Sequence, residues 1–325
     1  MTLNLMLTSR AVVFLSGDFR ISYSGGTRVV DDLHSQKLIP VITRHWSALV
    51  AFTGVAKTRN GVDVGDWIAE QISTLSEDAA FEELPRRLTS ADAWLARMRS
   101  DRRLAFSVVG FIKRRPVAMI VSNFTDLSGR HFGAVLDSLK VSEYRPKVPE
   151  VYAAGDTPAV RPSAITRLRR MLAAHTAPRQ IQSAIADANV ESAAHSNTIS
   201  KACVTGFLLA SAAAEVTPHG IPPGVEYVPT FVQRELAKSG VRGFKRKFDE
   251  HGVALPPQWV GMTAKAEDRK PGPWFVAIVH AMRNVAEPVG GGVRPPGTSV
   301  AWKIVGPNER PPISFQLTTK PKLER

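Results

Sequence analysis

The sequence predicts an α+β fold in which helices pack outside β-sheets. Three observations support this prediction. Apolar runs of strand length come in blocks, and these blocks alternate with pairs of amphipathic helical stretches. In addition, 44% of the 325 residues are hydrophobic, as in a globular protein. A chain of this length can bury one large or two ordinary cores.

Four apolar runs open the chain and are separated by turn residues. They lie at residues 3–7, 11–15, 38–42 and 48–52. Their length and separation predict four strands in a β-meander. Apolar residues at helical spacing then predict two helices, at 62–75 and 79–99.

A second block of strands follows these helices. The predicted strands lie at 105–112, 117–123, 133–142 and 150–154. Two further helical stretches, at 162–175 and 178–194, precede a last apolar run at 203–210. Strand blocks that alternate with helix pairs favour layered sheets and helices over alternating βαβ units.

Proline divides the chain into two predicted parts. Eight prolines fall in residues 1–212 and fifteen in residues 213–325, which also contain several glycine clusters. Such punctuation blocks long helices, so we predict a domain over 1–212 and a loop-rich extension with a few strands over 213–325. The net charge of +13 divides into +7 and +6, so the extension is the more basic part per residue.

Cysteine content and hydropathy exclude several classes of protein. Cys203 is the single cysteine, so an internal disulfide and a thiolate zinc site are excluded. No apolar stretch approaches the ~18 residues that a membrane-spanning helix needs, and no signal peptide is evident. We therefore expect a cytoplasmic protein. The usual motifs for serine hydrolases, zinc peptidases and P-loop nucleotide binding are absent from the sequence.

The second residue is the first candidate for chemistry. Thr2 follows Met1, and threonine is small enough to permit methionine removal. Thr2 would then carry a hydroxyl and a free α-amine, whose pKa of ~7.7–8.0 lets it accept the hydroxyl proton. Met-Thr also begins many proteins without this chemistry, so the prediction depends on the residues that accompany it.

Four further residues follow Thr2 in a characteristic order. Asp18 and Arg20 form an Asp-x-Arg at the end of the second apolar run, Lys37 opens the third, and Gly54 closes the fourth. Each has a plain alternative reading, as an exposed turn pair, an edge lysine or a strand-to-helix turn. Together with Thr2 they resemble the proteasome β-subunit family, including the HslV-type peptidases, which are N-terminal-nucleophile hydrolases.

The resemblance continues less closely towards residue 212. Asn197 and Ser200 occupy the place of an Asp-x-x-Ser pair, with Asn197 in place of the carboxylate. Asp156 stands after Gly155 where the family has a serine. The resemblance covers residues 2–212 and implies a four-layer α/β/β/α N-terminal-nucleophile sandwich, followed by the Pro/Gly-rich extension.

The resemblance also implies a mechanism and partners. Thr2 attacks a peptide or amide carbonyl, and Lys37 stabilises the alkoxide while Asp18 keeps Lys37 charged and oriented. The implied supporting groups are the Gly54 N–H as an oxyanion hole, Ser200 on the terminal amine, and Arg20 and Asn197 beside them. No metal or organic cofactor is implied. The expected partners are other copies of the chain in a homo-oligomeric ring, and an ATPase or another protein.

Basic clusters support a different class of function. Lys113-Arg114-Arg115 lies in a predicted hairpin turn, and Arg167, Arg169 and Arg170 lie on a predicted helix. A third cluster, Lys245-Arg246-Lys247, is flanked by phenylalanines, an arrangement found at polyanion contacts. The alternative is therefore a catalytically inactive scaffold or binding module whose extension binds nucleic acid or an acidic partner. A solvated basic face is the simpler reading of these charges.

Overall fold

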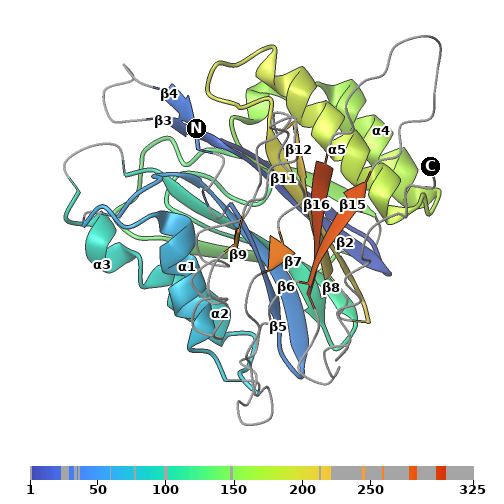
Figure 1. Ribbon diagram of the computed structural model, residues 1–325. Coiled ribbons are helices and arrows are strands. Elements are labelled where there is room, and N and C mark those ends of the chain that lie inside the picture. Colours follow the sequence, from blue (N-terminus) through green and yellow to red (C-terminus); the bar gives the residue numbers. More distant parts are fainter. Residues whose placement is uncertain are drawn as a thin grey trace, which may run out of the picture.

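The chain is a mixed α/β protein whose sheets are mostly antiparallel (Figure 1). The computed structural model describes residues 2–22, 29–32, 35, 37–58, 60–76, 78–98, 102–146, 149–211 and 214–220. Beyond residue 220 it describes only the backbone of four short strands: β13 (Phe244–Lys245), β14 (Gln258–Trp259), β15 (Ile278–Arg283) and β16 (Thr298–Ile304).

The larger sheet has seven strands in the order β10-β1-β2-β11-β12-β16-β15. Besides β15 and β16, this sheet contains β1 (Leu3–Thr8), β2 (Val12–Asp18), β10 (Glu150–Gly155), β11 (Cys203–Leu209) and β12 (Ala214–His219). The amino-terminal strand β1 therefore lies between β10 and β2. The predicted boundary near residue 212 remains a prediction, but β12, β15 and β16, which follow it, continue this sheet beyond β11.

The second sheet has five strands in the order β5-β6-β7-β8-β9. These are β5 (Leu38–Ile42), β6 (Trp46–Gly54), β7 (Leu104–Ile112), β8 (Arg115–Ser122) and β9 (Lys140–Tyr144). Two short ladders complete the described sheets, one of β3 (Arg20–Ser22) with β4 (Val29–Asp31) and one of β13 with β14.

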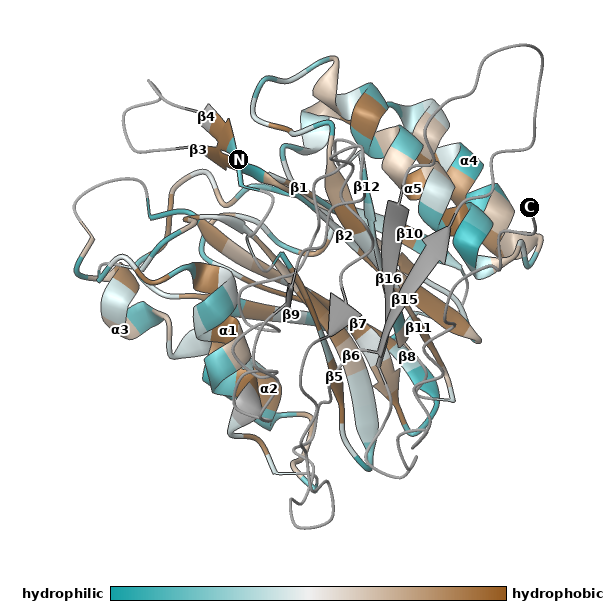
Figure 2. Cartoon of the chain, in the orientation of Figure 1, coloured by the Kyte–Doolittle hydropathy of each residue, from teal (hydrophilic) through white to brown (hydrophobic). Residues whose placement is uncertain are grey.

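The helices form two groups in Figure 1. The first contains α1 (Val64–Ser73), α2 (Glu83–Thr89) and α3 (Asp92–Leu95), and the second contains α4 (Pro162–Ala173) and α5 (Pro178–Ala193), preceded by the short helix η1 (Thr157–Ala159). In Figure 2 the helices are striped teal and brown, as expected of helices with one face on a sheet. No helix among the described residues is long and apolar enough to cross a membrane.

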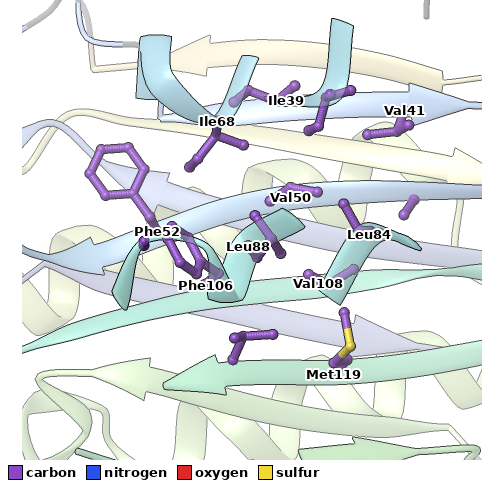
Figure 3. Close-up of a cluster of buried hydrophobic side chains, with 14 of the residues drawn as sticks. Ile39, Val41, Val50, Phe52, Ile68, Leu84, Leu88, Phe106, Val108 and Met119 are labelled. Carbon is purple, nitrogen blue, oxygen red and sulfur yellow. The ribbon is translucent and has the colours of Figure 1, made fainter. Parts of the chain in front are cut away.

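Three clusters of buried side chains hold these elements together. One joins the two sheets and includes Met6, Leu15 and Leu49. A second lies between the five-stranded sheet and α1–α3, where Val50 and Leu84 are buried (Figure 3). The third joins β1 and β2 to α4 and α5. Burial of apolar area at about 25 cal/mol per Å² makes these clusters the main source of stability.

Two sequence predictions about the first half of the chain are wrong. The first four runs do not form one meander, because β1 and β2 belong to the larger sheet and β5 and β6 to the smaller one. The helix predicted over 79–99 is divided into α2 and α3. The Ser90 hydroxyl donates to the carbonyl of Arg87 at the division, and such local bonds compete with helix continuation.

The strand predicted over 133–142 is also shorter than expected. β9 begins only at Lys140, because a loop occupies the preceding residues. The carboxylate of Asp126 accepts hydrogen bonds from the N–H groups of Ser128 and Arg130, and Gly133 has a φ of +77°. These features fix turns rather than an extended chain.

Candidate active site

Thr2 lies directly before β1, with its side chain in the protein interior. Its exposed fraction is 5%, and its Oγ1 has no hydrogen-bond partner among the described residues. Leu3 and Leu5 belong to the cluster under α4 and α5, whereas Met6 belongs to the cluster between the sheets. Because side chains alternate along a strand, the even-numbered positions, Thr2 included, face the five-stranded sheet.

The backbone of Thr2 is fixed by its neighbours. Its carbonyl oxygen accepts a 2.8 Å hydrogen bond from the Thr53 hydroxyl and a 3.3 Å bond from the Asp156 N–H. Gly155 has a φ of +95°, and a Cβ at this position would lie 1.8 Å from the same oxygen. Only glycine allows this close approach of the two chains.

Asp18 is buried at the end of β2 and binds three backbone N–H groups. One carboxylate oxygen accepts a 2.5 Å bond from Leu3, and the other accepts bonds from Arg20 (2.7 Å) and Ser200 (3.2 Å). The β1–β2 pairing ends at Met6 opposite Leu15, so the Leu3 N–H bonds to this side chain instead of to the β2 backbone. Burial raises the pKa of Asp18 to about 6, although the N–H groups and Lys37 favour the carboxylate.

Lys37 precedes β5 and is 1% exposed, with its ammonium 4.5 Å from the centre of the Phe52 ring. Its backbone passes close to β2 at Gly17, where a Cβ would lie 3.2 Å from the Lys37 carbonyl oxygen. Burial lowers the pKa of Lys37, and the charges of Asp18, Asp63 and Asp32 oppose this effect. An amine with a lowered pKa exchanges protons closer to neutral pH.

Asp63, which the sequence patterns do not select as a site residue, is a neighbour of Lys37. It caps α1 by accepting a 2.8 Å bond from the Gly65 N–H, and it accepts a 3.2 Å bond from the Ser35 hydroxyl. Burial raises its pKa, and Lys37 opposes this shift. An aspartate before a helical pattern signals an N-cap, but that signal says nothing of the lysine beside it.

The supporting residues lie around Asp18. The fully buried Ser200 donates its N–H to Asp18, and its hydroxyl oxygen accepts a 3.0 Å bond from the N–H of Ala202. Arg20 forms an ion pair with Asp31 and donates to the carbonyl of Asn197. Asn197 is exposed, and its described contact is the hydrogen bond that its backbone carbonyl accepts from Arg20.

Gly54 ends β6 with a φ of +100°. A Cβ at this position would lie 2.0 Å from the carbonyl oxygen of Arg103, so the strand can end in this way only with glycine. The predicted role of its N–H as an oxyanion donor remains a prediction.

Two of the three basic clusters lie on elements other than those that hold the residues above. Lys113 and Arg114 form the turn between β7 and β8, and the arginine cluster of residues 167–170 lies on α4. Of the third cluster, Arg246 and Lys247 lie outside the described residues, and Lys245 is described only as backbone in β13.

No family model and no curated protein sequence matches the chain. The solved structures to which the chain is similar include Anbu (ancestral beta-subunit) from Yersinia bercovieri, with 12% identity over 64% of this chain and 81% of that chain, at a TM-score of 0.44. The Gly-1 mutant of Anbu from Hyphomicrobium sp. strain MC1 has 11% identity over 64% and 83% of the two chains, at a TM-score of 0.43.

The predicted assignment to the proteasome β-subunit and HslV-type family is wrong. The matched structures are Anbu proteins, a distinct family. The assignment depended on short motifs spread over 212 residues, and so few positions do not separate one such family from another.

Proposed function

We propose that the chain is a threonine amidohydrolase or peptidase that uses Thr2 as its nucleophile after removal of Met1. The observation that carries this proposal is the bonding of Asp18. Its carboxylate ties the N–H of Leu3, next to the nucleophile, to the N–H of Ser200. Lys37 is buried beside the same carboxylate.

The proposed reaction has two steps. In the first, Thr2 Oγ1 forms a bond to the substrate carbonyl carbon while its proton passes to the α-amine. The C–N bond then breaks, and this proton leaves with the released amine. In the second step water attacks the ester carbon and gives a proton to the α-amine. The bond between this carbon and Thr2 Oγ1 then breaks, the proton passes from the amine to Oγ1, and the acid is released.

Other residues stabilise the charges that develop. Protonated Lys37 would favour the alkoxide of Thr2, and the N–H of Gly54 would donate to the developing oxyanion. Asp18 orients both the start of β1 and Lys37. The buried Thr2 hydroxyl supports the proposed nucleophilic role, because Oγ1 has no hydrogen-bond partner among the described residues.

The proposal includes a fold and an assembly. The three hydrophobic clusters support a four-layer α/β/β/α arrangement, with one cluster between the sheets and one under each group of helices.

We propose that the protein forms a homo-oligomer. Val141 and Tyr144 on the edge strand β9 are 47% and 44% exposed, which supports a contact there, and light scattering would measure the assembly.

A matched pair of threonine variants tests the proposed activity. Thr8 is the last residue of β1, the strand that Thr2 directly precedes. It is buried and likewise has an Oγ1 without a partner among the described residues. A panel of fluorogenic peptide amides should be hydrolysed by the wild type and by Thr8→Ala but not by Thr2→Ala. Equal hydrolysis by Thr2→Ala and the wild type would refute the role of Thr2 as the nucleophile. A wild-type chain that retains Met1 and hydrolyses none of the substrates would favour an inactive scaffold.

A further inference from the structure

Asp156 lies next to Thr2 across the pair of strands β1 and β10. The ladder between these strands reaches Leu3 opposite Gly155, and the Asp156 N–H then donates to the Thr2 carbonyl at 3.3 Å. In the sheet order, β1 lies between β10 and β2. The start of β1 is therefore flanked by an aspartate on each side, Asp18 from β2 and Asp156 from the end of β10.

The carboxylate of Asp156 is held in place by hydroxyl groups. Thr198 donates to one of its oxygens at 2.7 Å, and Ser196 donates to the same oxygen. Both belong to the segment between α5 and β11, which also contains Ser200. Because both hydroxyls bind one oxygen, the other has none of these bonds and can accept a further donor.

The mechanism proposed for Thr2 places a positive charge on its α-amine, and this charge needs a partner. Asn197 is neutral and exposed, and its described contact is made by its backbone carbonyl, so it supplies no opposite charge. A terminal amine that accepts the Thr2 proton becomes an ammonium, and a nearby carboxylate stabilises that charge. Asp156 is the carboxylate that the described residues place beside the Thr2 backbone on the β10 side.

We propose that Asp156 is a positioning residue that holds the α-ammonium group of Thr2. This inference rests on the proposed function, since it requires Thr2 to be the first residue. When Thr2 Oγ1 bonds to the substrate carbon, its proton moves to the α-amine, and Asp156 stabilises the resulting ammonium without giving or taking a proton itself.

Several other charged groups lie on the elements around Thr2. They are Asp18, Arg20, Lys37, Asp63 and Arg103. All of them are unchanged in the variants described next, so a change in the basicity of the amine reports on Asp156.

The test measures the α-amine directly. The full chain would be released from a cleavable fusion so that Thr2 is its first residue, and the pH dependence of trace acylation of the amine would be followed by mass spectrometry. The variants are Asp156→Asn and Asp156→Ser, which both remove the charge, the second with a smaller polar side chain. Asp137→Asn is the control, because Asp137 is an exposed carboxylate that pairs with Arg102.

We expect both Asp156 variants to lower the pKa of the α-amine by about one unit, a tenfold loss of proton affinity. The control should leave it unchanged. An unaltered pKa in a folded Asp156 variant would overturn the inference. This readout needs no substrate, so a chain that shows the pKa shift but hydrolyses no amide would refute the proposed function and leave the role of Asp156 intact.

Discussion

The carboxylate of Asp18 accepts a 2.5 Å hydrogen bond from the backbone N–H of Leu3. This bond connects the end of β2 to the residue that follows the proposed nucleophile. Asp18 is fully buried, and backbone N–H groups of Arg20 and Ser200 complete its bonding. One side chain thus fixes three segments that are far apart in the sequence.

The raised pKa of Asp18 predicts a pH-dependent stability. Its value of about 6 in the folded protein lies above the ordinary value of 3.8, so the folded state binds this proton more tightly than the unfolded state. The stabilisation is complete below pH 3.8 and is lost as the pH rises through 6. The loss is about 3 kcal/mol in the free energy of unfolding.

Asp18→Asn removes this titration and provides the measurement. Urea unfolding at pH 4 and pH 7 should show that the wild type loses stability relative to the variant over this interval. A stability difference that is the same at both pH values would contradict the raised pKa.

Gly155→Ala should destabilise the protein by at least about 3 kcal/mol, because the added Cβ meets the Thr2 carbonyl in a backbone conformation that alanine rarely adopts. Gly61→Ala is the matched control. Gly61 also has a positive φ, of +79°, but a Cβ added there would have no neighbour within 4 Å among the described residues, so we expect a cost of about 1 kcal/mol. Thermal unfolding of both variants measures the difference, and equal losses would show that the contact with Thr2 is unimportant.

Lys37→Met should reduce amide hydrolysis at least about 100-fold while the fold is retained, since methionine fills a similar volume beside Phe52. The control is Lys113→Met, at an exposed position in the turn between β7 and β8. Initial rates on the same substrates, with circular dichroism of both variants, provide the measurement. Full activity in a folded Lys37→Met protein would exclude Lys37 from the mechanism.

Two truncations test the predicted boundary near residue 212. β12 pairs with β11 over six residues, and Glu215 on β12 forms an ion pair with Arg179 on α5. A chain that ends at residue 220 should therefore be more stable than one that ends at residue 212, which leaves the edge of β11 unpaired. Yield, aggregation and thermal unfolding of the two chains would show which of them is more stable. Equal behaviour would support a domain that is complete at residue 212.

The sequence patterns predict the elements of the fold better than their assembly. Helical periodicity correctly predicts α1, α4 and α5, because each has one apolar face on a sheet. The patterns do not reveal that β1 and β2 separate from β5 and β6, since apolar runs do not encode which strands pair.

The same limit applies to the candidate site. Asp18 and Lys37 could be selected because they stand at the ends of apolar runs. Thr53 and Asp63 carry no such signal, because their contacts with Thr2 and Lys37 depend on the packing of distant segments. In the sequence Asp156 stands out only as a departure from a family pattern, and its bonds to Ser196 and Thr198 depend on the fold.

The most direct test of the central claim is the site of a covalent adduct. The purified chain would be treated with a β-lactone electrophile, digested, and its amino-terminal peptide sequenced by tandem mass spectrometry. We predict a chain without Met1, with the acyl group on Thr2 and no adduct at all on Thr2→Ala. A full-length chain that retains Met1 and remains unmodified at Thr2 would contradict the account.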